Sequence, residues 1–475
     1  MPSVVFLYIY GIISYMHNIW CHQGGNSMTS RTFHPGRLHG QATIPPAKSD
    51  VQRALLLSAM GRGPCRLHGC QPPLCDDVQA MINGVIALGV AVEQRGDVLT
   101  VRPSGIRLAD CAPASQVADF HVHACATALR MLIPVFWAKG QSARVTVDQG
   151  LESHSLEALR PLAEQSGASM ISHPAHGEEP AWVEVAGKLN AGSYRVVGSM
   201  SGRFASGLLI ALTHATDETS QPAPSRLMVT TPMADRPYLD ITLRMLREFG
   251  CNVREDPEGV FSMDPAGPSH RPRPHLAEVH IEGDWSLGAA LLCANAMGSA
   301  VVIQNLRERA SLQGDARILS LLREMGMLVY ENRQELYVTC PSRAGLIPLV
   351  TDCEDILDIV PMLALTCTQA HGMSVLTGME RLQGKERHRL QAIVELLRGM
   401  GGKMSLDGGA LIIDGPAQLK GGFLADAGDD HRAVQLMAIA ALIADGPVTV
   451  TGVEALSKSW PGFLKMYTAL GGKAE

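Results

Sequence analysis

The sequence lacks a strong charge of either sign. Its 475 residues include 40 lysines and arginines against 46 aspartates and glutamates, and no basic or acidic run stands out. Proteins that bind nucleic acid concentrate basic residues on one face, and disordered tails are often blocks of like charge. The composition therefore argues against a nucleic-acid partner and points to small molecules. Because 46% of the chain is hydrophobic, it can bury a large core, and two domains are expected at this length.

The sequence also lacks a C-x-x-C pair. Its 11 cysteines lie at irregular spacings, which predicts reduced, buried thiols in a cytoplasmic protein. Cys65, Cys70 and Cys75, with His68 among them, form a cluster. A metal site is the alternative there, but the surrounding proline and glycine residues are typical of a turn. We therefore predict no metal at this cluster.

A hydrophobic run of membrane-spanning length is missing as well. The apolar stretch VVFLYIYGIISYM at residues 4–16 is too short to cross a bilayer comfortably. It does not match a secretory signal, because the first basic residue is Arg31. We predict that residues 1–32 form an extension outside the fold, with Met28 as a candidate translation start. A membrane anchor is the alternative.

What the sequence does contain is a repeat. A helical pattern that ends in glycine occurs six times, at intervals of 70 to 83 residues. The glycines are Gly89, Gly167, Gly250, Gly326, Gly401 and Gly471. Each suits a left-handed helix C-cap. Each of the first five precedes a strand–turn–strand pattern, as in AVEQRGDVLTV.

A second helical segment precedes each of these glycine-terminated helices. The six segments are residues 50–60, 126–137, 201–213, 285–297, 358–370 and 431–444. They are apolar on nearly every face, which is typical of helices buried on all sides. The sequence therefore predicts an α/β unit of about 75 residues copied six times. The alternative is an ordinary α/β fold with chance similarity.

The chain ends indicate how the copies divide into domains. The sixth copy ends before its closing strands, whereas residues 32–46 offer a strand ahead of the first helix. If that strand completes the sixth copy, both chain ends belong to one domain. We predict residues 33–47 and 282–475 in domain I and residues 48–281 in domain II, with two crossing connections as a hinge.

Charged residues open several of the buried helices. Three helix N-termini aimed at one end of a domain would favour an anion. Lys48, in IPPAKSDVQRALLLSA, is unfavourable at a helix start unless a bound anion lies between it and the helix ends; alone, it would more simply reach solvent. Other cations lie at or near corresponding starts: Arg53, Arg130, Arg203, Lys385, Arg389, Arg432 and Lys458.

Two acids, Asp358 and Glu386, lie among these cations. A carboxylate beside Arg and Lys stays ionised and suits a base, whereas a proton donor needs burial or a nearby anion to raise its pKa. Taken singly, each acid is more often a helix cap or an ion-pair partner.

The repeats and a series of motifs resemble the 5-enolpyruvylshikimate-3-phosphate synthase (3-phosphoshikimate 1-carboxyvinyltransferase) family. In chain order the motifs are PPAKSDVQRALLL, ATALR, GSMSGRF, RPYLDITLRMLREFG, IEGDWS, LQGDAR, GKERHRL, DDHRAVQLMAIAAL and SKSWPGF. The resemblance runs from about residue 33 to the C-terminus. It implies two inside-out α/β domains, each of three βαβαββ repeats, which is the enolpyruvyl transferase fold, with the active site in the cleft between them.

This resemblance implies transfer of the enolpyruvyl group from phosphoenolpyruvate to the 5-hydroxyl of shikimate 3-phosphate, with release of phosphate, on the route to chorismate and the aromatic amino acids. Addition through a tetrahedral adduct needs positioning, proton transfer and charge neutralisation, so no metal and no cofactor are implied. We expect a cytoplasmic monomer with these two small molecules as partners.

The resemblance also assigns residues. The implied ligands of shikimate 3-phosphate are Lys48, Ser49, Arg53, Ser201, Tyr238, Asp358 and Lys385. Those of phosphoenolpyruvate are Lys48, Ala126, Arg203, Arg389, Arg432 and Lys458. Asp358 is the implied base for the attacking hydroxyl and Glu386 the implied acid for the methylene carbon, while Lys48 touches both substrates.

Several positions depart from the family pattern. Its NAGTxxR motif reads ACATALR here, so Ala126 replaces a glycine and its methyl group should crowd phosphoenolpyruvate. His154 stands at an arginine of the phosphoenolpyruvate site, Arg203 at a glutamine and Arg381 at an asparagine. Our hypothesis is that Arg203 compensates for the charge lost at His154.

Three functions therefore stay open. The shikimate-pathway transferase is favoured, because the acid, the base and most cations occur together. An enolpyruvyl transferase for another acceptor is the second, since the altered positions reshape both substrate sites. UDP-N-acetylglucosamine enolpyruvyl transferase shares the implied fold, but KERHR and DDHR resemble the shikimate enzyme more closely. The third is an anion-binding homologue without turnover.

Overall fold

The computed structural model describes residues 29–475, apart from 62, 104–116, 149–150, 152–155, 157–158, 178, 199–201, 222, 232, 234, 265–276, 333–334, 340–344, 381 and 383. For residues 384–386 it describes the backbone alone. Among the residues so described, no helix has both the length and the apolar character needed to span a membrane.

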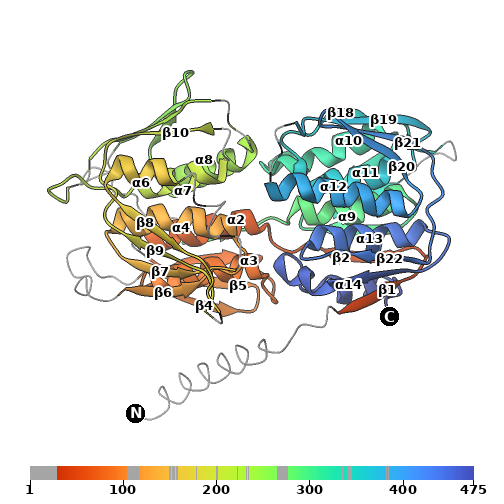
Figure 1. The fold of residues 1–475 in the computed structure, drawn as a ribbon, viewed down its shortest axis with the longest axis horizontal. Helices are drawn as coiled ribbons and strands as arrows, with labels where there is room; N and C mark the ends of the chain where they lie inside the picture. The colour runs from red at the N-terminus through yellow and green to blue at the C-terminus, as the bar shows by residue number, and fades with distance from the viewer. Residues whose placement is uncertain are drawn as a thin grey trace, which may run out of the picture.

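The buried apolar side chains form two separate cores. One draws on residues 33–44 and 285–470, and the other on residues 51–281. Figure 1 shows the two corresponding halves side by side. The domain boundaries at residues 47 and 281 stay a prediction, which the two cores support.

Each half contains three copies of one unit. The first comprises α2 (Lys48–Met60), β3 (Cys65–His68), α3 (Asp76–Ala87), β4 (Ala91–Arg95) and β5 (Val98–Arg102). The second comprises β6 (Ala118–His121), α4 (Ala126–Lys139), β7 (Ala143–Thr146), α6 (Arg160–Ser166), β8 (Ser169–His173) and β9 (Trp182–Ala186). The third comprises β10 (Ser193–Val196), α7 (Gly202–Leu212), β11 (Ser225–Val229), α8 (Arg236–Glu248), β12 (Val253–Glu255) and β13 (Val260–Met263).

The other half repeats the pattern. Its fourth unit comprises α9 (Trp285–Ala296), β15 (Ala300–Gln304), η2 (Glu308–Ala310), η3 (Gly314–Arg317), α10 (Ile318–Glu324), β16 (Leu328–Glu331) and β17 (Glu335–Thr339). The fifth comprises β18 (Val350–Asp352), η4 (Leu357–Ile359), α11 (Val360–Cys367), β19 (Gly372–Thr377), α12 (Gly384–Gly399), β20 (Lys403–Asp407) and β21 (Ala410–Gly415). The sixth comprises β22 (Phe423–Asp426), α13 (His431–Ile443), β23 (Val448–Thr451), η5 (Val453–Lys458) and α14 (Phe463–Ala469).

Each unit has its own small mixed sheet. In the third, β10 pairs parallel with β11, β11 pairs antiparallel with β13, and β12 closes a hairpin with β13. The second and fifth sheets repeat this order. The result is an α/β fold of six small sheets, as the repeat predicted.

Three sheets include a strand from another part of the chain. β14 (Glu278–His280) joins β3 in the first sheet, and β2 (His39–Thr43) joins β15 in the fourth. β1 (Ser30–Phe33) pairs antiparallel with β23 in the sixth. A strand near the N-terminus does complete the sixth copy, but it is β1, which begins at Ser30 and so lies mostly in the extension, residues 1–32, that was predicted to lie outside the fold. β2, the strand inside the predicted segment 32–46, completes the fourth copy instead, because it pairs with β15.

The six predicted buried helices are confirmed as α2, α4, α7, α9, η4 with α11, and α13. In α9 every residue except Ser286 is buried, and in α13 every residue except Arg432 and Ile443. Such helices lie inside their half, and Figure 1 shows sheets on the outside. Ser286 and Arg432 occupy first turns, so these two helices expose side chains at their N-terminal ends, where the candidate site forms.

The six predicted glycine caps are confirmed as well. The glycines at the ends of the repeats have φ between 71° and 93°. This left-handed backbone is costly for residues with a Cβ, which explains why glycine recurs there.

Candidate active site

The starts of buried helices from both halves meet at one place. The backbone N–H of Lys48, at the start of α2, donates to Asp284 Oδ2 ahead of α9 at 3.4 Å. Arg432 Nη2, in the first turn of α13, lies 2.7 Å from Asp358 Oδ2 in η4. Arg203 Nη2, in the first turn of α7, lies 3.9 Å from the same oxygen. Convergence of helix N-termini is confirmed for these described elements.

Asp358 lies at the centre of this arrangement. The Tyr238 hydroxyl donates to its Oδ2 at 2.9 Å. Burial raises the pKa of Asp358, but surrounding cations outweigh burial and hold the pKa below its usual range. These cations are Arg432, Arg203, Lys48 and Arg389. The carboxylate is therefore ionised at neutral pH and able to accept a proton.

Asp315, in η3, is a second acid beside Asp358. Ser286 Oγ donates to its Oδ2 at 2.5 Å. Burial and the negative charge of Asp358 raise the pKa of Asp315 to about 8. Asp315 therefore carries a proton at neutral pH while its neighbour does not. Asp315 is not among the site residues predicted from the sequence, although the family motif LQGDAR contains it, because the sequence does not show its burial beside another acid.

Each of the main cations has an acidic partner in the protein. Lys48 Nζ lies 2.9 Å from Asp77 Oδ2, and Arg203 Nη1 lies 3.4 Å from Asp235 Oδ2. Arg389 Nε contacts Asp430 Oδ2, and Asp430 also caps α13 by accepting from the Arg432 backbone N–H at 2.9 Å. Burial lowers the pKa of Lys48, but Asp77 and other neighbours more than offset this, so the pKa is raised and the ammonium stays charged. The cations are thus held in place before any substrate arrives.

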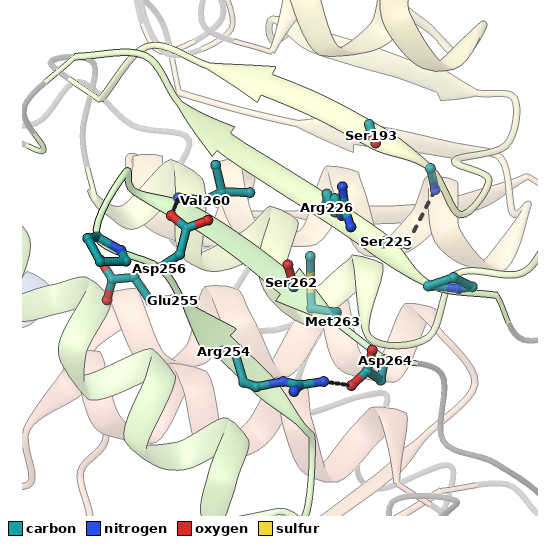
Figure 2. Close-up of a pocket in the computed structure, with 13 residues that line it drawn as sticks. Ser193, Ser225, Arg226, Arg254, Glu255, Asp256, Val260, Ser262, Met263 and Asp264 are labelled. Atoms are coloured by element: carbon teal, nitrogen blue, oxygen red, sulfur yellow. Dashed lines mark hydrogen bonds and ion pairs between the residues drawn. The ribbon is translucent and has the colours of Figure 1, made fainter.

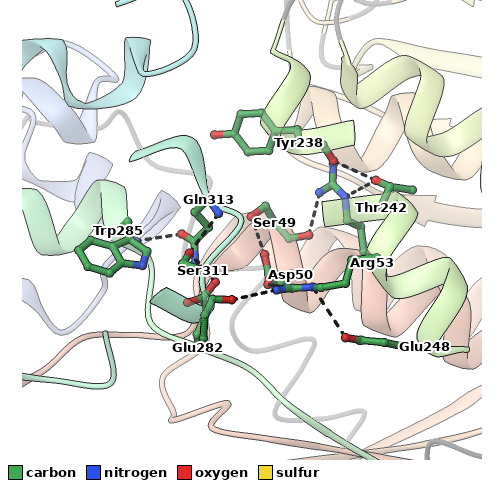
Figure 3. Close-up of polar contacts among 12 residues, drawn as sticks. Ser49, Asp50, Arg53, Tyr238, Thr242, Glu248, Glu282, Trp285, Ser311 and Gln313 are labelled. Atoms are coloured by element: carbon green, nitrogen blue, oxygen red, sulfur yellow. Dashed lines mark hydrogen bonds and ion pairs between the residues drawn. The ribbon is translucent and has the colours of Figure 1, made fainter. Parts of the chain in front are cut away.

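Arg53 makes different contacts from those expected of a substrate ligand. Its side chain is fully buried, and Figure 3 shows its guanidinium among Ser49, Tyr238 and Thr242. Nε donates to Thr242 Oγ1 at 2.7 Å, Nη1 to the Ser49 carbonyl at 2.8 Å and Nη2 to the Tyr238 carbonyl at 3.0 Å. Burial lowers the pKa of Arg53 to about 10, so it remains charged. Arg53 joins α2 to α8 here, and its predicted contact with shikimate 3-phosphate stays a prediction.

Lys458 and Ala126 belong to opposite halves and lie near one loop. Lys458 Nζ, at the end of η5, donates to the Ala124 carbonyl at 3.3 Å. Ala126 is the first residue of α4, and the preceding Cys125 Sγ accepts from the Ala128 backbone N–H at 3.4 Å. The loop that contains the altered family motif ACATALR thus leads into α4, and the N-terminus of α4 faces Lys458 of the other half.

The chain matches the EPSP synthase (3-phosphoshikimate 1-carboxyvinyltransferase) family over residues 33–466. It belongs to this family. The 3-phosphoshikimate 1-carboxyvinyltransferase of Clostridioides difficile is 28% identical over 453 residues, which cover 94% of this chain and 99% of the relative. That of Aeropyrum pernix is 31% identical over 450 residues, which cover 93% and 96%.

Solved structures agree on the fold. An EPSP synthase of Acinetobacter baumannii superposes with a TM-score of 0.73 at 22% identity, covering 94% of this chain and 99% of that one. The enolpyruvyl transferase NikO of Streptomyces tendae superposes with a TM-score of 0.68 at 17% identity, covering 94% and 98%. The predicted enolpyruvyl transferase fold is confirmed, and the chain is an enolpyruvyl transferase family enzyme.

Some residues predicted from the family pattern lie outside the described residues. Ser201, His154 and Arg381 are among them. Lys385 and Glu386 lie on α12, but their side chains are not described. Their predicted roles in the family reaction stay predictions.

Two other features include no residue that the family pattern assigns to the site, although Cys75 lies close to Lys48 and Asp77. Cys65, Cys70 and Cys75 are buried free thiols, and none belongs to a group of potential metal ligands among the described residues. A groove of about 760 Å³ lies over the sheet of β10 to β13, and Figure 2 shows residues that line it. Its Arg254 pairs with Asp264, and no predicted site residue lines it.

Proposed function

We propose that this protein transfers the enolpyruvyl group of phosphoenolpyruvate to the 5-hydroxyl of shikimate 3-phosphate and releases phosphate. The observation that carries the proposal is the ionised Asp358 held among cations from both cores. A base in that setting can take a proton from a hydroxyl while the cations bind the phosphate and carboxylate groups of the reactants.

The proposed reaction has two steps. In the first step Asp358 accepts the proton of the 5-hydroxyl, and the hydroxyl oxygen bonds to C2 of phosphoenolpyruvate. Glu386 protonates the methylene carbon in the same step. The tetrahedral adduct then loses phosphate from C2 while Glu386, now a carboxylate, takes a proton back from the methyl carbon, and the proton held by Asp358 leaves with the phosphate. The carbon–carbon double bond thereby re-forms, and the product is an enol ether. Lys48, Arg432, Arg389 and Lys458 supply positive charge for phosphoenolpyruvate and the departing phosphate. Arginine suits these oxyanions because its N–H groups match them in pairs.

A different acceptor is the second candidate function, and Arg203 favours it. Its guanidinium lies 4.3 Å from the centre of the Tyr238 ring and close to Asp358. Tyr238 and Asp358 are both proposed to face the acceptor. At position 203, beside them, an arginine stands where the family has a glutamine. An acceptor with a further negative group would gain from that charge.

Phosphate release separates these possibilities. Purified protein is mixed with phosphoenolpyruvate and shikimate 3-phosphate, then with other phosphorylated or cyclic alcohols. Release with shikimate 3-phosphate supports the main proposal, and release only with another acceptor supports the second. Thermal stabilisation by phosphoenolpyruvate without any release indicates an anion-binding homologue and contradicts both. Complementation of a strain that lacks the pathway's carboxyvinyl transfer tests the same proposal in cells.

The monomeric state and the cytoplasmic location remain part of the proposal. Light scattering coupled to gel filtration would measure the mass in solution, and a dimer would contradict the monomer.

A further inference from the structure

Three potential metal ligands lie together at the end of the second sheet. They are His121 at the end of β6, His123 two residues later, and Asp148 two residues beyond β7. One ligand atom from each lies within 4.8 Å of the others. His121 Nε2 is 3.1 Å from Asp148 Oδ1, and the two imidazole rings have centroids 4.0 Å apart.

The backbone sets this arrangement. β6 and β7 pair in parallel, with His121 opposite Thr146, so both strands end at the same edge. The Asp148 backbone N–H donates to the His123 carbonyl at 3.2 Å, which ties the two loops together. His123 has a φ of 50°, a left-handed conformation that is uncommon for a residue with a side chain. Such a conformation at a clustered histidine suggests a functional constraint.

The donor set selects a class of ion. Two imidazole nitrogens and one carboxylate oxygen suit Zn²⁺ and similar divalent transition metals, whereas Mg²⁺ and Ca²⁺ prefer oxygen ligands alone. Ligand atoms around Zn²⁺ at bonds of about 2.1 Å are roughly 3.4 Å apart in a tetrahedron, so small side-chain rotations suffice. His121 and Asp148 have side chains 37% and 51% exposed, so an ion can enter from solvent and keep a water as fourth ligand.

We propose that His121, His123 and Asp148 bind one Zn²⁺-class cation. The bound ion links the loop that precedes α4 to the end of β7. That loop includes Ala124, whose carbonyl accepts from Lys458 of the other half, so the ion also fixes a contact between the halves. The binding site does not depend on the proposed transferase reaction.

The test uses the full-length protein after removal of metal by a chelator. Isothermal titration with Zn²⁺ is expected to show one site per chain in the wild type. His123→Asn and Asp148→Asn are each expected to lose at least about tenfold in affinity, since even groups that only orient a metal ligand contribute that much. Asparagine tolerates the left-handed backbone at position 123, so that variant should fold. Thermal unfolding and circular dichroism without metal verify this for both variants.

The matched control is His68→Asn. His68 also stacks on a histidine, His280, and lies near a carboxylate, Glu278, but it belongs to no described three-ligand group. Its variant is expected to bind Zn²⁺ like the wild type. Thermal unfolding should show stabilisation by Zn²⁺ in the wild type and the control but not in the ligand variants.

Three results would overturn the proposal. The first is the absence of saturable Zn²⁺ binding in the wild type, and the second is equal binding in the wild type and both ligand variants. The third is a thiolate charge-transfer band on titration with Co²⁺, which would assign the metal to cysteine instead.

Discussion

Two neighbouring acids in the candidate site, Asp358 and Asp315, have different pKa values because different charges surround them. Asp358 and Asp315 are both shielded from solvent, yet cations lower the pKa of the first, while burial and the charge of its neighbour raise that of the second to about 8. Neighbouring acids with separated pKa values are typical of catalytic pairs. The separation leaves Asp358 as the proton acceptor and Asp315 as a neutral hydrogen-bonding group.

Asp358→Asn should therefore abolish most of the activity. The amide cannot accept the hydroxyl proton, so we expect kcat for phosphate release to fall by about 10²- to 10⁴-fold. Asp315→Asn is the matched control, because an amide resembles the protonated acid, and it should keep most of kcat at pH 7. Steady-state kinetics compare the two variants. Equal losses would contradict the division of roles.

Arg203→Gln should raise the KM for phosphoenolpyruvate several-fold. The change restores the family's residue but removes a partly buried cation beside Asp235 and Asp358. Arg236→Gln is the control, because that arginine pairs with Glu255 on the partly exposed side of α8 and should leave KM unchanged. An unaltered KM in Arg203→Gln would refute the idea that this residue supplies charge for phosphoenolpyruvate.

At the residue scale, the sequence predicted that cations gather at the helix starts but did not predict their acidic partners, and the substrate contacts of these cations stay predictions. Lys48, Arg203 and Arg432 occupy first turns of repeated helices, so their convergence follows from the repeat. Asp77 and Asp315 come from other segments of the chain, and only the folded structure brings them beside a cation or another acid. Pairing between distant segments leaves no local pattern to detect.

The buried helices pack closely enough that small residues are required. A Cβ added at Gly207 in α7 would lie 2.6 Å from the Met131 Cα and 2.9 Å from the Arg130 carbonyl oxygen in α4. Both are backbone atoms, so the helices themselves would have to separate. The contact explains a glycine inside a helix, where it is otherwise unfavourable.

Gly207→Ala should destabilise the protein by about 2 kcal/mol. Alanine alone would favour the helix by about 1 kcal/mol, but overpacking against the backbone costs up to about 3 kcal/mol and wins. Gly36→Ala is the control, since nothing lies within 4 Å of its added Cβ. Urea unfolding measures both. Stabilisation of Gly207→Ala would show that the helices separate easily.

Asp50, in the first turn of α2 beside the two crossing connections, is a buried acid whose ionised form is disfavoured by its surroundings. Burial and Glu282 raise the pKa of Asp50 to about 7, although Arg244 lies 3.3 Å away. Figure 3 shows Asp50 near Glu282, and the two crossings meet where the Ala47 N–H donates to the Glu282 carbonyl at 2.8 Å. The folded state therefore binds a proton here that the unfolded chain releases at lower pH.

Stability should consequently fall as pH rises from about 4 to about 7. The contribution of protonated Asp50 is complete below its unfolded pKa of 3.8 and is lost through its folded pKa of about 7. Asp50→Asn should reduce the difference in unfolding free energy between pH 5 and pH 8 by on the order of 2 kcal/mol. Urea unfolding at both pH values measures it, with Asp240→Asn on the partly exposed side of α8 as the control. An unchanged difference in Asp50→Asn would contradict the raised pKa.

Helices and helix caps could be predicted from the sequence because the patterns that indicate them lie within a short stretch of the chain. The buried helices and glycine caps follow from composition and periodicity within a short window, and they lie where expected. The exchange of β14 and β2 into sheets of distant repeats was not predicted, because parallel pairing depends on segments far apart in the chain. Only the incomplete sixth copy gave a hint of such an exchange.

At the scale of the whole molecule, polar contacts join the two cores in the part of the chain that the structure describes. Tyr238 and Arg203 reach Asp358 from one half, Lys458 reaches Ala124 from the other, and the crossings run beside α2. Contacts of this kind are weaker than a shared apolar core. We therefore expect the halves to unfold separately, each with its own stability.

Phe33→Ala tests this expectation together with the domain boundaries. Phe33, in β1, is fully buried and packs edge-on against Tyr467 at 5.4 Å, so its truncation should cost about 3 to 5 kcal/mol. Calorimetry of the ligand-free protein is expected to show two transitions. Phe33→Ala should lower only the transition of the half that contains residues 285–470, whereas Gly207→Ala should lower only the other.

Leu424→Ala serves as the control for Phe33→Ala, because Leu424 is 66% exposed in β22, a strand of the same sheet, and should shift neither transition. A single transition that both core variants lower equally would mean that the crossings and the charged contacts couple the halves into one cooperative unit. In that case the N-terminal strand would stabilise the whole chain, and the boundaries at residues 47 and 281 would not separate independent domains.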